Sequence, residues 1–218
     1  MKKILFNLEN EPMSGLTHFI GFLFALAGLV LLTVFASLQG NVWHVVSFSI
    51  FGTSMVLLYA ASSAYHFVPI TSRVKSLMQR IDQSMVYVLI AGTYTPLALV
   101  TLRGPWGWSL FGVIWGLALV GVVLRIFNIV VPKSISLGLY LVMGWLALIF
   151  IFPLKQHLSS VALFLLFLGG IFYTLGSIAF AFGHITFYPK WFGMHEVFHI
   201  FVMCGTAAHF CLIFGYLL

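Results

Sequence analysis

The sequence predicts an all-α integral membrane protein with seven transmembrane helices, and three observations lead to this prediction. The chain of 218 residues is 62% hydrophobic. Only 6% of its residues are charged, whereas ordinary soluble domains carry about 25%. The apolar residues form continuous runs long enough to cross a bilayer as helices, and runs that do not alternate with polar residues argue against a transmembrane β-barrel.

Polar or charged residues separate the successive runs. The first run follows the polar segment 1–15, the second ends at His66, the third begins at Asp82, and Arg103 precedes the fourth. Charged loops divide the later runs in the same way, at Lys133, Lys155 and Lys190. We therefore expect one membrane domain over residues 1–218 with spans at 16–38, 43–66, 82–102, 107–124, 135–153, 160–182 and 195–217. The longest connection, 67–81, has about fifteen residues and leaves no room for a large soluble domain.

The loop charges orient the predicted helices. With seven spans, one side of the membrane carries most of the basic residues: Lys2, Lys3, Arg73, Lys75, Arg80, Arg125, Lys133 and Lys190. The other side carries only Arg103 and Lys155. Basic loops stay in the cytoplasm, so the N-terminus is expected to be cytoplasmic and the C-terminus outside. The net charge of +6 then reflects topology and contact with anionic headgroups, and no nucleic-acid partner is expected.

The N-terminal segment and the cysteines indicate no secreted, disulfide-bonded protein. Acidic and polar residues interrupt MKKILFNLENEPMSGLTHF, and no small-residue cleavage site follows, so no cleaved signal peptide is expected. Cys204 and Cys211 both fall in the seventh span and are expected to be reduced.

Five polar residues are expected at one depth near the cytoplasmic end of the bundle. The second span ends with Ser62 and His66, the third begins at Asp82, and the seventh begins with His195 and His199. The second span runs inward and the other two run outward, so these residues converge. Ionisable side chains at membrane depth are costly and usually functional.

This convergence predicts a zinc site. His195 and His199 lie four apart and hence about 40° apart around a helix, so both can face one metal ion. His66 would complete a set of three ligands, which leaves a zinc ion one position for water and can lower the pKa of that water towards about 7. Asp82 is placed to hold the water or accept its proton, and Ser62 to orient Asp82 or donate to a substrate oxyanion.

Structural roles remain open for each residue taken alone. A histidine at a helix end can serve as an interfacial anchor, and this is the reading for His18, which could also line the site. Asp82 could be the N-cap of the third helix, and Ser62 a small packing residue. His209 lies too far along the seventh span to join the metal.

The stretch GMHEVFH contains the HExxH pattern of zinc metalloproteases. Intramembrane metalloproteases take their third ligand from an Asp-Gly turn, whereas the only aspartate here, Asp82, is followed by Gln83. Glu196 is therefore interpreted as a cap of the seventh helix, where negative charge is favoured.

Four segments carry a family resemblance: EPMSGLTHFIG at 11–21, SSAYHF at 62–67, DQSMVYVLIAGTYTP at 82–96 and HEVFHIFVMCGTAAHF at 195–210. Together they resemble the progestin and adipoQ receptor family, in particular its bacterial haemolysin III-like branch. The resemblance spans essentially the whole chain. It implies a multi-pass protein of the bacterial inner membrane with a cytoplasmic N-terminus.

The same resemblance implies roles for five residues. His66, His195 and His199 would be zinc ligands, Asp82 would bind the zinc-held water, and Ser62 would be the associated polar residue. Relatives in the wider family point to hydrolysis of lipid amides, whereas the haemolysin III name implies cytolysis.

Three functions are therefore carried forward. The first is a zinc-dependent hydrolase of an acyl-lipid amide or ester, with membrane lipids as partners and a substrate that enters laterally. The second is a non-enzymatic receptor or regulator of membrane homeostasis with structural zinc, in which Pro96 could kink the third span to form a moving element. The third is a channel or cytolysin.

Overall fold

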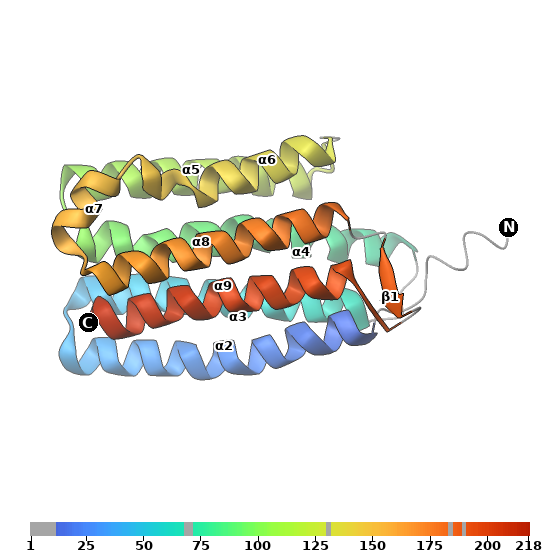
Figure 1. The fold of residues 1–218 in the computed structure, drawn as a ribbon, viewed down its shortest axis with the longest axis horizontal. Helices are drawn as coiled ribbons and strands as arrows, with labels where there is room; N and C mark the ends of the chain where they lie inside the picture. Colours follow the sequence, from blue (N-terminus) through green and yellow to red (C-terminus); the bar gives the residue numbers. More distant parts are fainter. Residues whose placement is uncertain (1–11, 68–71, 130–131, 183–184, 189–190) are drawn as a thin grey trace, which may run out of the picture.

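The computed structural model describes residues 12–67, 72–129, 132–182, 185–188 and 191–218, which are nearly all helical (Figure 1). The long helices are α2 (Pro12–Gln39), α3 (Val42–Phe67), α4 (Ser72–Pro96), α5 (Pro105–Ile126), α8 (Ser160–Ala181) and α9 (Met194–Tyr216). Shorter elements are the π-helical turn η2 (Leu97–Thr101), α6 (Lys133–Gly144), the 3-10 turn η3 (Leu146–Leu148) and α7 (Ile151–His157). Strands β1 (Thr186–Tyr188) and β2 (Phe192–Gly193) form a small antiparallel hairpin before α9.

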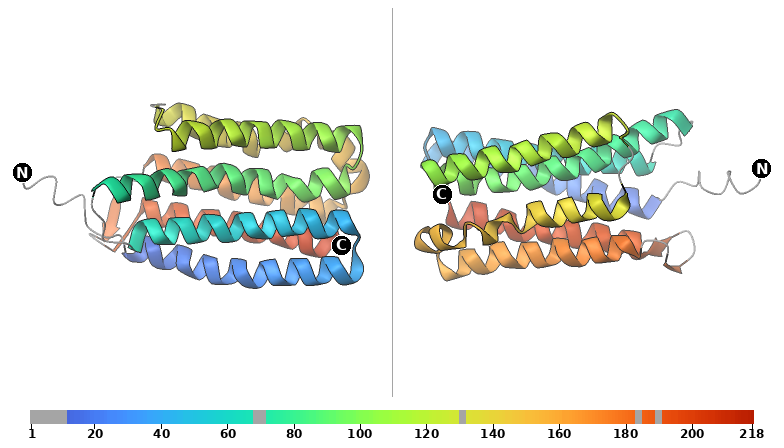
Figure 2. Two further views of the ribbon diagram at one scale, coloured as in Figure 1. Left: turned by 180° about the vertical axis from the view of Figure 1, so that it is seen from behind. Right: turned by 90° about the horizontal axis from the view of Figure 1, so that it is seen from above.

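The long helices lie side by side along the long axis of the molecule (Figures 1 and 2). Helix α2 packs on both α3 and α9, α3 packs on α4, α4 on α5, and α8 on α9. The C-terminus lies at the end of the bundle opposite to the β1–β2 hairpin (Figure 1). Within the described ranges, six helices are long and apolar enough to cross a membrane, and there are seven if the bent pair α6–α7 is one span.

Large apolar side chains cover the outside of the bundle. Phe24, Val30 and Leu119 are 71%, 60% and 64% exposed, which a water-soluble surface would not sustain over whole helices. The interior is also largely apolar, and it contains buried serines, threonines and histidines as well. The apolar outer surface, together with the helix lengths, marks a multi-pass membrane protein.

Helix α4 begins ten residues before the expected start of the third span. Its first turns, SRVKSLMQRI, are polar and amphipathic, and such residues form a helix without being apolar enough to enter a predicted span. Asp82 consequently lies inside α4, so the alternative that Asp82 is the N-cap of this helix is wrong. Pro96 is the last residue of α4, which continues directly into the π-helical turn η2.

The segment expected to form the fifth span, 135–153, is a broken helix, since α6 and α7 are bent by 51° relative to each other and make one span only if taken together. The hydroxyl of Tyr94 from α4 enters the backbone ladder shortly before the bend. It donates to the Gly144 carbonyl at 2.6 Å and accepts from the Ala147 amide at 2.9 Å. These two contacts replace α-helical hydrogen bonds where α6 gives way to η3, and the 51° bend follows at the break between Leu148 and Ile151.

Candidate metal centre

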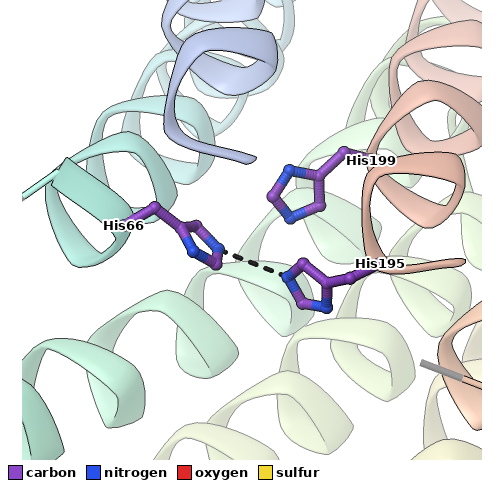
Figure 3. A group of neighbouring side chains, drawn as sticks. All are labelled: His66, His195 and His199. Atoms are coloured by element: carbon purple, nitrogen blue, oxygen red, sulfur yellow. Dashed lines mark hydrogen bonds between the residues drawn. The ribbon is translucent and has the colours of Figure 1, made fainter. Parts of the chain in front are cut away.

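Three histidines from two helices converge at the end of the bundle that carries the hairpin. His66 comes from the last turn of α3, and His195 and His199 come from the first turns of α9, with their rings directed towards a common space (Figure 3). One ring nitrogen from each of the three lies within 4.8 Å of the others. The Nε2 atoms of His66 and His195 are 3.4 Å apart. His66 and His199 are buried and His195 is partly buried.

His199 is held in one orientation by the first turn of α2. Its Nδ1 lies 3.2 Å from the Ser14 carbonyl oxygen and 3.2 Å from the Thr17 hydroxyl. A carbonyl oxygen only accepts, so Nδ1 carries the proton and Nε2 keeps a lone pair for a metal. A fixed second nitrogen of this kind is typical of metal-binding histidines.

Glu196, the acidic residue of the HExxH pattern, faces the backbone and α2. Its Oε2 accepts from the Gly193 amide at 2.7 Å, which makes a capping box at the start of α9, and its Oε1 accepts from the Ser14 hydroxyl at 2.5 Å. The capping role expected for Glu196 is confirmed, and both carboxylate oxygens are engaged. The interaction with Ser14 was not predicted from the sequence.

His18 is buried beside the three histidines, so the expectation that it anchors α2 in the interface is wrong. It is 3% exposed, and its ring stacks on the ring of His199 with centroids 3.6 Å apart and planes 11° apart. Tyr59 contacts its other side edge-on at 5.1 Å. The ring of His199 is thus contacted from α2 by Ser14, Thr17 and His18. All three lie in the EPMSGLTHFIG segment that carried part of the resemblance, which is the signal that could have identified them.

Asp82 and Ser62 lie next to the histidines on facing helices. The side chain of Ser62 is a hydrogen-bond partner of the Asp82 carboxylate, and His66 lies close enough to interact with that carboxylate electrostatically. Ser62 is 1% exposed and Asp82 is partly buried. Both line the same internal cavity as His195 and His199.

This cavity has a volume of about 480 Å³ and extends from the histidines into the bundle between α4, α6, α8 and α9. Its lining is mostly apolar beyond the histidine end, with Leu89, Leu97 and Phe167 among the residues. His209 lines the deep part, where its Nε2 bonds the Leu166 carbonyl at 3.1 Å. A cavity of this size with few convergent polar groups has the character of a ligand site.

The donor set fits a metal ion. Neutral imidazoles bind Zn²⁺, and three protein nitrogens leave further positions open, as in catalytic rather than closed structural sites. His66, His195 and His199 are the metal-competent group among the described residues. His209 is hydrogen-bonded to the Leu166 carbonyl, away from the three histidines. His184, which follows the predicted sixth span, lies outside the described residues. Cys204 and Cys211 are free thiols, as expected.

Comparison with known proteins agrees with this architecture. The model of the family described as haemolysin-III related matches residues 6–210. The chain is 42% identical to the hemolysin-3 homolog of Bacillus subtilis over 211 residues, which cover 96% of both chains. It is 38% identical to hemolysin-3 of Bacillus cereus over 208 residues, covering 95% of this chain and 92% of that one. The human monocyte to macrophage differentiation factor is 26% identical over 185 residues, 83% of this chain and 74% of the relative.

These matches extend over nearly all of the chain and include the segments that carry the histidines, Asp82 and Ser62. The resemblance found in the sequence is therefore confirmed. The chain belongs to the haemolysin-III-related family of multi-pass membrane proteins, the bacterial relatives of the progestin and adipoQ receptors.

Proposed function

We propose that this protein is a zinc-dependent hydrolase of the bacterial plasma membrane that cleaves an acyl-lipid amide or ester. One observation carries the proposal: a group of three histidines able to hold a metal ion lies at the end of a mostly apolar cavity, beside an aspartate bonded to a serine. Such a reaction needs a metal site, a proton-transfer group and room for an apolar substrate.

His66, His195 and His199 would hold the zinc ion. When bound, zinc polarises a carbonyl oxygen and makes water a better nucleophile at neutral pH. Ser14 and Thr17 hold His199 in the tautomer that leaves Nε2 available. His18 packs against the same ring and limits its rotation.

Asp82 would move the proton in this reaction. Hydrolysis adds water across the acyl carbon–nitrogen or carbon–oxygen bond, releasing a fatty acid and an amine or alcohol. The Asp82 carboxylate accepts a proton from water and returns it to the leaving nitrogen or oxygen. Ser62 donates to Asp82 and keeps the carboxylate directed at the cavity.

The cavity suits a lipid that comes from the bilayer. Its walls are largely apolar, so an acyl chain placed there leaves hydrocarbon for another apolar environment while its polar linkage reaches the histidine end. We propose lateral entry from the membrane, with the N-terminus in the cytoplasm and the C-terminus outside.

A second function is favoured by the position of the site between two helices, α3 and α9. Helices α3 and α9 pack on α2 and on other neighbours more than on each other, so a metal held by His66, His195 and His199 would tie them together. In this case the zinc is structural, and the protein regulates the membrane without turning over a lipid.

Substitution of Asp82 separates the two functions. Asp82→Ala and the parent should bind equal amounts of zinc, while the mutant loses turnover of an acyl-lipid amide or ester presented in mixed micelles. Ser62→Ala should lower turnover less severely. Ser63→Ala is the matched control, because the Ser63 hydroxyl bonds the Gly15 carbonyl in α2 instead of Asp82. Equal lipid hydrolysis by Asp82→Ala and the parent would rule out the proposed mechanism.

A further inference from the structure

The wall of the cavity includes an arginine. Among the lysines and arginines whose side chains the structure describes, Arg125 is the one that lines it. Arg125 belongs to the last turn of α5 and is partly buried. Gln79, Gln83 and Ser136 line the cavity as well and, like Arg125, come from the cytoplasmic halves of their predicted spans or the adjoining turns. This wall is therefore polar, whereas the rest of the lining is mostly apolar.

Tyr140 of α6 fixes the position of the Arg125 guanidinium. The Tyr140 hydroxyl donates to the Gln83 carbonyl at 3.0 Å, and the Arg125 side chain lies close enough to interact with the hydroxyl oxygen. The Tyr140 ring packs on Tyr87 with centroids 4.4 Å apart. The guanidinium carries several N–H donors, and this interaction uses only part of them.

The charge of Arg125 is not balanced by a carboxylate of the described chain. Only two side-chain carboxylates are described. Asp82 interacts with Ser62 and His66, and Glu196 with Ser14 and Gly193. A cation at the wall of an apolar cavity is costly unless an anion pairs with it. Arginine forms bidentate hydrogen bonds with phosphate and carboxylate groups in such places.

We infer that Arg125 binds the anionic group, a phosphate or carboxylate, of an amphiphile whose hydrocarbon chain occupies the apolar part of the cavity. Tyr140 holds the guanidinium in position, and the neighbouring glutamines and Ser136 supply further hydrogen bonds. The inference rests on the proposed function only for the statement that this amphiphile is the substrate. Binding of the anion requires neither zinc nor turnover.

The test compares two amphiphiles that differ in charge. Purified full-length protein in neutral detergent is titrated with dodecyl phosphate and with dodecanol, and binding is measured from the rise in the thermal unfolding midpoint. The parent should bind dodecyl phosphate about tenfold or more tightly than dodecanol. Arg125→Gln should abolish this preference, and Lys75→Gln should retain it. Lys75 of α4 is the matched control because its ammonium group lies over the ring of Tyr65 in α3 and Lys75 does not line the cavity.

Further variants and ligands make each outcome decisive. Tyr140→Phe keeps the ring packed on Tyr87 and removes the hydroxyl, so it should weaken binding of dodecyl phosphate even if Arg125→Gln does not fold. Inorganic phosphate distinguishes a free anion from a lipid headgroup, and it should bind far more weakly than dodecyl phosphate. Equal binding of dodecyl phosphate and dodecanol by the parent would overturn the inference. An equal loss of the preference for dodecyl phosphate in Lys75→Gln would also overturn the inference, because it would indicate a general attraction of anions to the basic residues.

Titrations on the Asp82→Ala variant keep this result separate from the proposed function. A retained preference for dodecyl phosphate without turnover supports the anion site alone. Turnover in the parent without any such preference supports the hydrolase alone.

Discussion

The hydroxyl of Ser14 in α2 donates to the carboxylate of Glu196 in α9 at 2.5 Å, across 182 positions of the sequence. The carbonyl of the same serine lies 3.2 Å from Nδ1 of His199. One residue of α2 therefore contacts both the cap of α9 and a histidine of the candidate metal centre. The orientation of that histidine depends on how α2 and α9 are joined at this end.

Removal of the Glu196 carboxylate should destabilise the protein. Glu196→Ala leaves the buried Ser14 hydroxyl and the Gly193 amide without their partner, at a cost of about 1–3 kcal/mol for each unsatisfied group. The thermal unfolding midpoint should fall clearly. Glu196→Gln is the matched control, because its amide can accept from Gly193 and donate to Ser14, so it should unfold close to the parent.

The same pair of variants tests whether Glu196 acts as the general base of a metalloprotease-like site. In our account Glu196→Gln keeps most of the hydrolytic activity. A folded Glu196→Gln protein that binds zinc but has lost all turnover would assign Glu196 a chemical role and contradict the capping interpretation.

His18 should act as a packing partner of the metal centre. Phenylalanine at this position preserves a ring stacked on His199, so His18→Phe should bind the same amount of zinc as the parent. His18→Ala removes the stacked ring, and loss of such support typically weakens metal affinity by about 10- to 100-fold. Zinc competition with a chromogenic chelator measures both variants. Complete loss of zinc in His18→Phe would instead make His18 a ligand.

Removal of the metal should loosen the bundle. A ligand that binds only the folded state stabilises it by about 4 kcal/mol when present at 1,000 times its dissociation constant. Treatment with a chelator should lower the unfolding midpoint, and added zinc should restore it. His199→Ala should show little response to either. A parent protein that unfolds identically with and without chelator would mean that no metal links α3 to α9.

The two termini should lie on opposite sides of the membrane. Seven crossings require that the bent pair α6–α7 passes through the bilayer as one span, whereas six crossings would leave both ends on the same side. Alkaline phosphatase fused after Leu218 should be active and green fluorescent protein fused there should be dark. The reverse pattern would show that α6–α7 enters and leaves on one side, or that the basic loops face outward.

Much of the helical architecture could be predicted because transmembrane helices correspond to long apolar runs in the sequence. The convergence of His66, Asp82 and the two histidines of α9 could also be predicted, since span direction sets the depth of each residue. Contacts between helices could not be predicted in this way. In the fifth span, Pro153 in the first turn of α7 is a signal within the segment for a break, whereas the contacts of the Tyr94 hydroxyl with Gly144 and Ala147 come from α4, about fifty positions earlier in the chain.

The contacts around the site could not be predicted from hydropathy either. Hydropathy marked where α2 crosses the membrane but not which of its faces meets α9, so His18 was expected at the interface. Its stacking on His199 and the bond from Ser14 to Glu196 depend on the packing angle of two helices far apart in sequence. The early start of α4 was missed because a polar, amphipathic helix outside the apolar run gives no hydropathy signal.

The most direct test of the metal centre is the zinc content of purified protein, parent against His66→Ala, measured by inductively coupled plasma mass spectrometry. His157→Ala is the control, because His157 is an exposed residue of α7 whose Nδ1 lies 2.8 Å from the Pro153 carbonyl, away from the three histidines. We expect about one zinc per chain in the parent and in His157→Ala, and almost none in folded His66→Ala. A His66→Ala protein that retains the full zinc content of the parent would contradict a site built from His66, His195 and His199.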